Sequence, residues 1–112
     1  MTQRIFRFLA DKHPDTPCLV VDLDRVEHNY RALAEALPVA RIFYAVKANP
    51  APALIGRLAK LGAKFDVASP GEIDLCLAAG VAPSRISYGN TIKKQRDIAY
   101  AYRRGIRLFA FD

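Results

Sequence analysis

The sequence contains little of what metal and disulfide sites need. It has no tryptophan, one methionine, two histidines and two cysteines, Cys18 and Cys76. The cysteines lie far apart and lack the spacing of a metal site, so we expect no metal centre. Both cysteines are interpreted as free thiols, which are usual in a reducing compartment, and a cytoplasmic protein is therefore expected.

Long apolar runs are also absent. No run approaches the roughly 20 residues that a transmembrane helix needs. The N-terminus has no apolar signal-peptide core, because Arg7, Asp11 and Lys12 interrupt it. A membrane is therefore not expected as a partner. Hydrophobic residues still make up 52% and charged residues 25% of the 112 residues, a composition typical of globular rather than disordered proteins.

Positive charge is in excess, with a net charge of +6. Much of the excess falls between Lys93 and Arg107, where Ile92, Ile98 and Tyr102 recur at helical spacing. The basic residues then form the solvated face of an amphipathic helix. No nucleic-acid-binding motif accompanies them, so no nucleic-acid partner is expected.

A strand followed by a helix recurs along the chain from Ile42 onward. Short apolar runs predict strands at residues 42–46, 64–67, 85–88 and 107–111, with helical periodicity between them. The period of roughly 20 to 23 residues suits parallel strands joined by crossover helices. The sequence therefore predicts an α/β fold, either an open doubly wound sheet or the N-terminal half of a (β/α)8 TIM-type barrel.

Capping residues mark where the helices begin. Asp24 and Glu27 have capping-box spacing at the start of a helix that Pro38 ends. Ser69 and Glu72 have the same spacing at the start of a later helix.

Functional residues of a parallel sheet are expected at the C-terminal ends of its strands. Those ends carry polar groups, which are Lys47–Ala48–Asn49, Asp66 with Ser69, Tyr88–Gly89–Asn90 and Asp112. Lys47 stands out because it follows five apolar residues, and apolar surroundings favour the neutral amine that forms a Schiff base with a carbonyl group. A lysine at a strand end is more often simply solvated, so this spacing alone does not decide its role.

Residues 43–49, FYAVKAN, resemble the cofactor-lysine motif of the fold-type III pyridoxal-phosphate decarboxylases, which are alanine-racemase-like barrels. The similarity continues in register through residues 62–69, 71–73 and 85–94. Within that family, Tyr88–Gly89–Asn90 followed by Lys93 and Lys94 is more similar to ornithine and related basic-amino-acid decarboxylases than to diaminopimelate decarboxylase.

The resemblance implies a cofactor and its ligands. Lys47 would hold pyridoxal 5'-phosphate, whose pyridine ring takes up the electrons left by the departing carbon dioxide. Asp66 matches a family aspartate close to the cofactor, although a side-chain turn at the strand end explains Asp66 equally well on sequence alone. Glu72 also matches a family position near the site, but its spacing from Ser69 favours a helix cap, so it is left out of the site.

The resemblance also implies a function. For the full-length protein we expect decarboxylation of a basic L-amino acid, with ornithine favoured over lysine, to a diamine for polyamine biosynthesis by a cytoplasmic homodimer. Two alternatives stay open, which are a diaminopimelate decarboxylase of lysine biosynthesis and a non-catalytic, decarboxylase-like regulatory binding protein. Retention of Lys47 argues against the regulatory protein.

The resemblance divides the chain near residue 22. Residues 1–22 would be a lead segment with a strand near residues 18–21, and residues 23–112 would be the first part of the pyridoxal-phosphate-binding barrel. The family's phosphate-binding turn and C-terminal β-domain have no counterpart in this sequence. We therefore expect this chain to be a fragment that is inactive alone and that associates through its uncovered strand edges.

Overall fold

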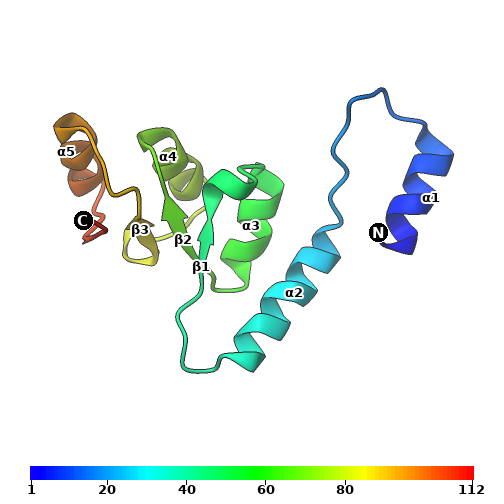
Figure 1. Cartoon of the computed structure of the whole chain (residues 1–112), viewed down its shortest axis with the longest axis horizontal. Helices are drawn as coiled ribbons and strands as arrows, with labels where there is room; N and C mark the ends of the chain where they lie inside the picture. The colour runs from blue at the N-terminus through cyan, green and yellow to red at the C-terminus, as the bar shows by residue number, and fades with distance from the viewer.

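The computed structural model describes residues 1–112 (Figure 1). In chain order its elements are α1 (Gln3–Lys12), α2 (Leu23–Ala36), β1 (Phe43–Ala45), the 3-10 helix η1 (Val46–Ala48), α3 (Pro52–Lys60), β2 (Lys64–Val67), α4 (Pro70–Ala78), the 3-10 helix η2 (Pro83–Arg85), β3 (Ile86–Tyr88), α5 (Gln95–Arg103) and β4 (Leu108–Phe109). No helix combines the length and the hydropathy needed to cross a membrane.

The four strands form one sheet in the order β1-β2-β3-β4. All three neighbouring pairs are parallel, and their register aligns Ala45 with Asp66, Asp66 with Ser87, and Ser87 with Leu108. The predicted parallel βα repeat is therefore confirmed. The strands are shorter than predicted at their ends, since Val46 belongs to η1 and Phe111 lies beyond β4.

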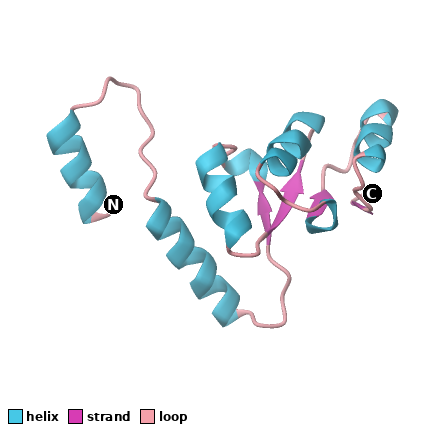
Figure 2. Cartoon of the chain, turned by 180° about the vertical axis from the view of Figure 1, so that it is seen from behind, coloured by secondary structure: helices cyan, strands magenta, loops and turns pink.

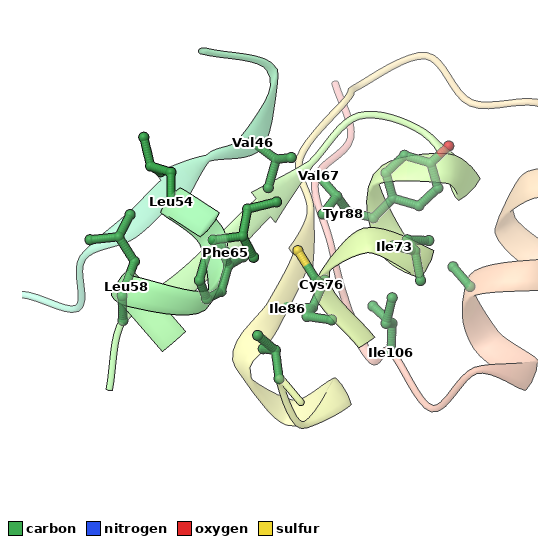
Figure 3. Close-up of a cluster of buried hydrophobic side chains, with 14 residues drawn as sticks. Val46, Leu54, Leu58, Phe65, Val67, Ile73, Cys76, Ile86, Tyr88 and Ile106 are labelled. Atoms are coloured by element: carbon green, nitrogen blue, oxygen red, sulfur yellow. The ribbon is translucent and has the colours of Figure 1, made fainter. Parts of the chain in front are cut away.

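The helices that follow the strands cover one face of this sheet (Figure 3). Phe65 and Val67 of β2, with Ile86 and Tyr88 of β3, are buried in one cluster with side chains of α3, α4 and α5. The alternate strand positions lie on the other face, and none of them is buried. A sheet covered on one side agrees with a segment of a barrel, whereas a doubly wound sheet carries helices on both faces. The fold is thus the N-terminal part of a TIM-type barrel.

Glycines in the left-handed conformation return the chain from helix to strand. Gly62 has φ of 86° after α3, and the next amide, that of Ala63, donates to the Leu58 carbonyl oxygen at 3.1 Å. Gly80, with φ of 79°, plays the same part after α4. These positions favour glycine because a side chain strains the backbone there.

The lead segment differs from the prediction. Residues 18–21 form no strand, because no other strand of the chain lies alongside to pair with them, and Leu19 is 82% exposed. Figures 1 and 2 show α1 standing apart from the sheet at the end of this extended segment. Thr2 holds α1 against α2 by donating to Asp22 at 2.8 Å. This hydrogen bond is the main cause that lowers the pKa of Asp22.

The predicted capping box of α2 was wrong. Asp22, not Asp24, is the N-cap, and its carboxylate accepts from the amides of Asp24 at 3.1 Å and Arg25 at 3.4 Å. Glu27 therefore does not cap the helix. Its carboxylate lies 3.0 Å from the guanidinium of Arg57, so that it ties α2 to α3.

The predicted apolar stripe of α5 was also wrong. The Asn90 side chain donates to the carbonyl oxygen of Ile92 at 2.9 Å, which keeps residues 90–92 in a turn and delays the helix until Gln95. Ile92 is consequently 85% exposed and lies outside the helix. Ala101 is the buried residue of α5, whereas Tyr102 is exposed.

Arg85 generates a prediction about stability. Its guanidinium donates to the carbonyl oxygens of Ala59 at 2.9 Å and Ala63 at 3.1 Å, so that it joins the end of α3 to the start of β3. Replacing it by methionine, R85M, leaves these carbonyls without their charged donor and should lower the free energy of unfolding by about 1.5–3 kcal/mol. Urea denaturation followed by circular dichroism measures the change.

The matched control is Arg96→Met. Arg96 is exposed, and its ion pair joins it only to the adjacent Asp97. Exposed ion pairs contribute little, so no measurable loss of stability is expected. Equal losses for the two variants would contradict the role given to Arg85.

Candidate functional site

Three strand ends meet at one edge of the sheet. β1 leads directly into η1, which carries Lys47, while Asp66 lies near the end of β2 and Gly89 follows β3. Because the strands are parallel and in register, the structure brings both predicted site residues, Lys47 and Asp66, to the same end of neighbouring strands. This is the end at which barrel enzymes place their reacting groups.

Lys47 lies in a short 3-10 turn and faces solvent. Val46 is fully buried and anchors the turn, and the amide of Asn49 donates to the Val46 carbonyl oxygen at 3.1 Å. Lys47 itself is exposed, and its Nζ forms neither a hydrogen bond nor an ion pair. The apolar surroundings expected for Lys47 are therefore not found, because Val46, and not Lys47, is the residue of this turn that enters the core. The unpaired amine remains available to a ligand.

Tyr44 and Asn49 fix the turn that carries Lys47. The Tyr44 hydroxyl donates to the Asn49 carbonyl oxygen at 3.1 Å, and the Asn49 side chain accepts from the amide of Ala51 at 3.0 Å. Burial raises the pKa of Tyr44, so its hydroxyl stays protonated and remains a donor. The sequence analysis gave neither residue a role. For Asn49, the Asn–Pro pair at residues 49–50 could have predicted this turn, since asparagine side chains often close turns by binding the backbone two residues later.

Asp66 stands on the open face of the sheet beside Gly89. A Cβ atom at position 89 would lie 2.6 Å from the Cγ of Asp66, which is closer than real Cβ atoms approach. The carboxylate is half-buried and accepts no hydrogen bond, so the side-chain turn left open by the sequence is not formed. Gly89 thus leaves room for a carboxylate whose acceptors are unused.

Glu72 caps α4, as the sequence predicts. The Ser69 hydroxyl accepts from the amide of Glu72 at 3.3 Å. The Glu72 carboxylate reaches back to accept from the amide of Ala68 at 2.8 Å, one residue before the expected partner. Glu72 therefore fixes the chain between Asp66 and the helix.

Tyr88 and Asn90 stay outside the site. Tyr88 is 2% exposed and lies in the helix-covered core, where burial raises the pKa of its hydroxyl. Lys93 lies with its Nζ 5.3 Å from the centre of the Tyr88 ring and donates to the Ala110 carbonyl oxygen. This lysine therefore ties the loop after β3 to the residue that follows β4. Asn90 is exposed and serves the turn described above.

The two cysteines take no part in the candidate site, since Cys18 precedes α2 and Cys76 lies within α4. Both are free thiols, with Cys18 exposed and Cys76 buried in α4. Burial, with a contribution from the charge of Glu72, raises the pKa of Cys76 to about 11. No three side chains of the histidine, cysteine, aspartate and glutamate types gather as metal ligands would.

Comparison with known proteins gives concordant similarities. The family model described as "Pyridoxal-dependent decarboxylase, pyridoxal binding domain" matches residues 23–112. The lysine/ornithine decarboxylase of Selenomonas ruminantium is 42% identical over 112 residues, which is all of this chain and 28% of that protein. Antizyme inhibitor 2 of Xenopus laevis is 43% identical over 93 residues, 83% of this chain and 20% of its own length.

A solved structure agrees with these similarities. The crystal structure of SrLDC in complex with PLP and cadaverine superposes with a TM-score of 0.87 at 41% identity, covering 100% of this chain and 29% of that one. The chain thus spans less than a third of the length of the relatives it matches.

The cap formed by Glu72 can be separated from a role in ligand binding. Glu72→Ala leaves the amide of Ala68 without its acceptor and should lower the free energy of unfolding by about 0.5–2 kcal/mol in urea denaturation. Glu72→Gln keeps an acceptor oxygen and should lose less. Equal losses in the two variants would show that the hydrogen bond is not what stabilises this helix end.

Proposed function

The chain belongs to the pyridoxal-dependent decarboxylases, and on this basis we propose that it forms the first part of the cofactor-binding barrel of an enzyme that decarboxylates a basic L-amino acid. One observation carries the proposal. The unpaired amine of Lys47 lies at the C-terminal end of a barrel strand, in a turn fixed by Tyr44 and Asn49, at the same sheet edge as Asp66.

The residues at this edge fit pyridoxal 5'-phosphate. When bound, the cofactor supplies an electron sink for the carbanion left by loss of carbon dioxide. Lys47 offers a primary amine without a competing partner, which covalent attachment to an aldehyde requires. Asp66 offers a carboxylate with no hydrogen bond of its own, and Gly89 keeps the adjacent space open.

Each residue then has a distinct task. Lys47 holds the cofactor through its Nζ, and its exposed position lets an incoming substrate amine reach the same point. Tyr44, through the Asn49 carbonyl, prevents the turn from moving and so orients the lysine. Asp66 accepts a hydrogen bond from the bound molecule. Val46, buried beneath the turn, keeps the lysine at the surface of the barrel mouth.

The names of the relatives support a basic substrate. The relatives include a lysine/ornithine decarboxylase from Selenomonas ruminantium, and a lysine/ornithine decarboxylase from Vibrio vulnificus has been crystallised with putrescine. We propose ornithine as the substrate, with lysine as the second choice, and a diamine as the product. We further propose that the full-length protein is a cytoplasmic homodimer that serves polyamine synthesis. The two free cysteines bear only on the compartment, because free thiols fit a reducing one.

A regulatory binding protein is the second candidate. The similarity to antizyme inhibitor 2 of Xenopus laevis favours it, since that relative is named as an inhibitor rather than as a decarboxylase. Such a protein has no need of a cofactor lysine. Lys47, kept unpaired at the strand end, therefore favours the enzyme.

Turnover by the full-length protein tests the proposal. With added pyridoxal phosphate it should release carbon dioxide from L-ornithine or L-lysine, and Lys47→Ala should reduce the rate to the uncatalysed background. Lys47→Arg should fail as well, because a guanidinium keeps the charge but does not bond covalently to the aldehyde.

The control is Lys60→Ala. Lys60 is an exposed lysine in the last turn of α3, and its removal should leave turnover unchanged. Full activity of Lys47→Ala would refute the role of this lysine. A wild-type protein that releases no carbon dioxide from any basic amino acid would favour the regulatory candidate.

A further inference from the structure

Gly89, which directly follows β3, is a glycine that its backbone conformation does not require. Three other glycines, Gly62, Gly80 and Gly105, have positive φ angles, which residues with a side chain rarely adopt. Gly89 is not among them, so its φ angle also suits an alanine. The space beside position 89 is therefore the remaining structural reason for a glycine.

The nearest atoms to a side chain at position 89 all belong to Asp66. A Cβ atom there would lie 2.6 Å from both the Cγ and the Oδ2 of Asp66, whereas real Cβ atoms essentially never come within 3.0 Å of such a group. At the two other glycines without a positive φ angle, Gly56 and Gly71, a Cβ atom would meet nothing closer than 3.9 Å. The missing side chain at position 89 is thus matched to one carboxylate.

The backbone at position 89 is held in place, whereas the carboxylate beside it is not. The amide of Gly89 donates to the Val67 carbonyl oxygen at 3.1 Å, which continues the pairing of β3 with β2. Asp66 is in register with Ser87, and Gly89, two residues after Ser87, faces the same open side of the sheet. Because the Asp66 carboxylate accepts no hydrogen bond, a methyl group at position 89 displaces this carboxylate rather than the strand.

The neighbour of Asp66 on its other side is also small. On β1 the residue in register with Asp66 is Ala45, whose side chain is a single methyl group. The Asp66 side chain can therefore rotate toward β1 without disturbing the core, since Phe65 and Val67 of the same strand are buried on the opposite face. Glycine at position 89 gives the carboxylate more room at the end of β3 than alanine gives it at β1.

We propose that Gly89 is a positioning residue of the candidate site, because the absence of a side chain there sets the direction of the Asp66 carboxylate. The inference rests on the proposed function, in which Asp66 accepts a hydrogen bond from the bound cofactor. It adds that the direction of this acceptor, as well as its presence, determines how tightly pyridoxal phosphate is held. Loss of a hydrogen bond to a charged group weakens binding about tenfold or more.

Fluorescence titration of the full-length apoprotein with pyridoxal phosphate tests this coupling. Gly89→Ala should raise the dissociation constant about tenfold or more, while thermal unfolding followed by circular dichroism stays as in the wild type. Asp66→Ala should weaken binding to a similar extent. The double variant should bind as Asp66→Ala does, because the added methyl group then has no carboxylate to displace. Crystal structures of the cofactor-free proteins should show the carboxylate beside residue 89 in the wild type and rotated away in Gly89→Ala.

The matched control is Gly56→Ala, which adds the same methyl group to α3 where nothing lies within 4 Å of it, and which should bind the cofactor as the wild type does. Unchanged binding by Gly89→Ala, or an equal loss with and without the Asp66 carboxylate, would overturn the proposal. A carboxylate that keeps its place in the Gly89→Ala crystal structure would refute the role of Gly89 alone. Wild-type protein that binds no pyridoxal phosphate would instead refute the proposed function, and with it the task given to Asp66.

Discussion

The burial of alternate side chains of β2 and β3 against the helices determines which residues of the sheet face the candidate site. Phe65, Val67 and Ile86 are almost completely removed from solvent, and burial of a side chain of this size contributes about 1.5–3 kcal/mol. Because strand side chains alternate, this choice of face sends Asp66 to the open side of the sheet. A shift of one residue in register would bury that carboxylate instead and expose the core.

Burial of one side chain also fixes the direction of its neighbour at the end of β1. Val46 is buried completely, and the chain turns immediately after it, so that the next side chain is directed outward. Lys47 is thereby presented at the strand end without being buried, and the hydrogen bond from Tyr44 to the Asn49 carbonyl holds the turn that carries it. The site thus depends on a fixed backbone more than on a special environment around the amine.

The sequence was sufficient for features that depend on local patterns. Continuous apolar runs located all four strands, and the capping residues Ser69 and Glu72 located the start of α4. The positions of Lys47 and Asp66 at one sheet edge followed from the parallel order alone. The family motif around Lys47 agrees with the match to the pyridoxal binding domain.

Features that depend on contacts distant in sequence were not predictable. Glu27 has the spacing of a cap but pairs with Arg57, thirty residues away, because α2 packs beside α3. The exposure of Lys47 depends on which residue of the turn enters the core, and apolar neighbours in sequence do not reveal it. The position of Asp66 over Gly89 joins two strands and is visible only in three dimensions.

Lys47 is proposed to hold the cofactor, and locating the covalent attachment tests this role directly. The full-length protein, loaded with pyridoxal phosphate, is reduced with borohydride, digested and mapped by mass spectrometry. The pyridoxyl label should lie on the peptide containing Lys47, and it should be absent when the amine of L-ornithine has replaced Lys47 on the cofactor before reduction. A label on any other lysine, such as Lys64 or Lys93, would contradict it.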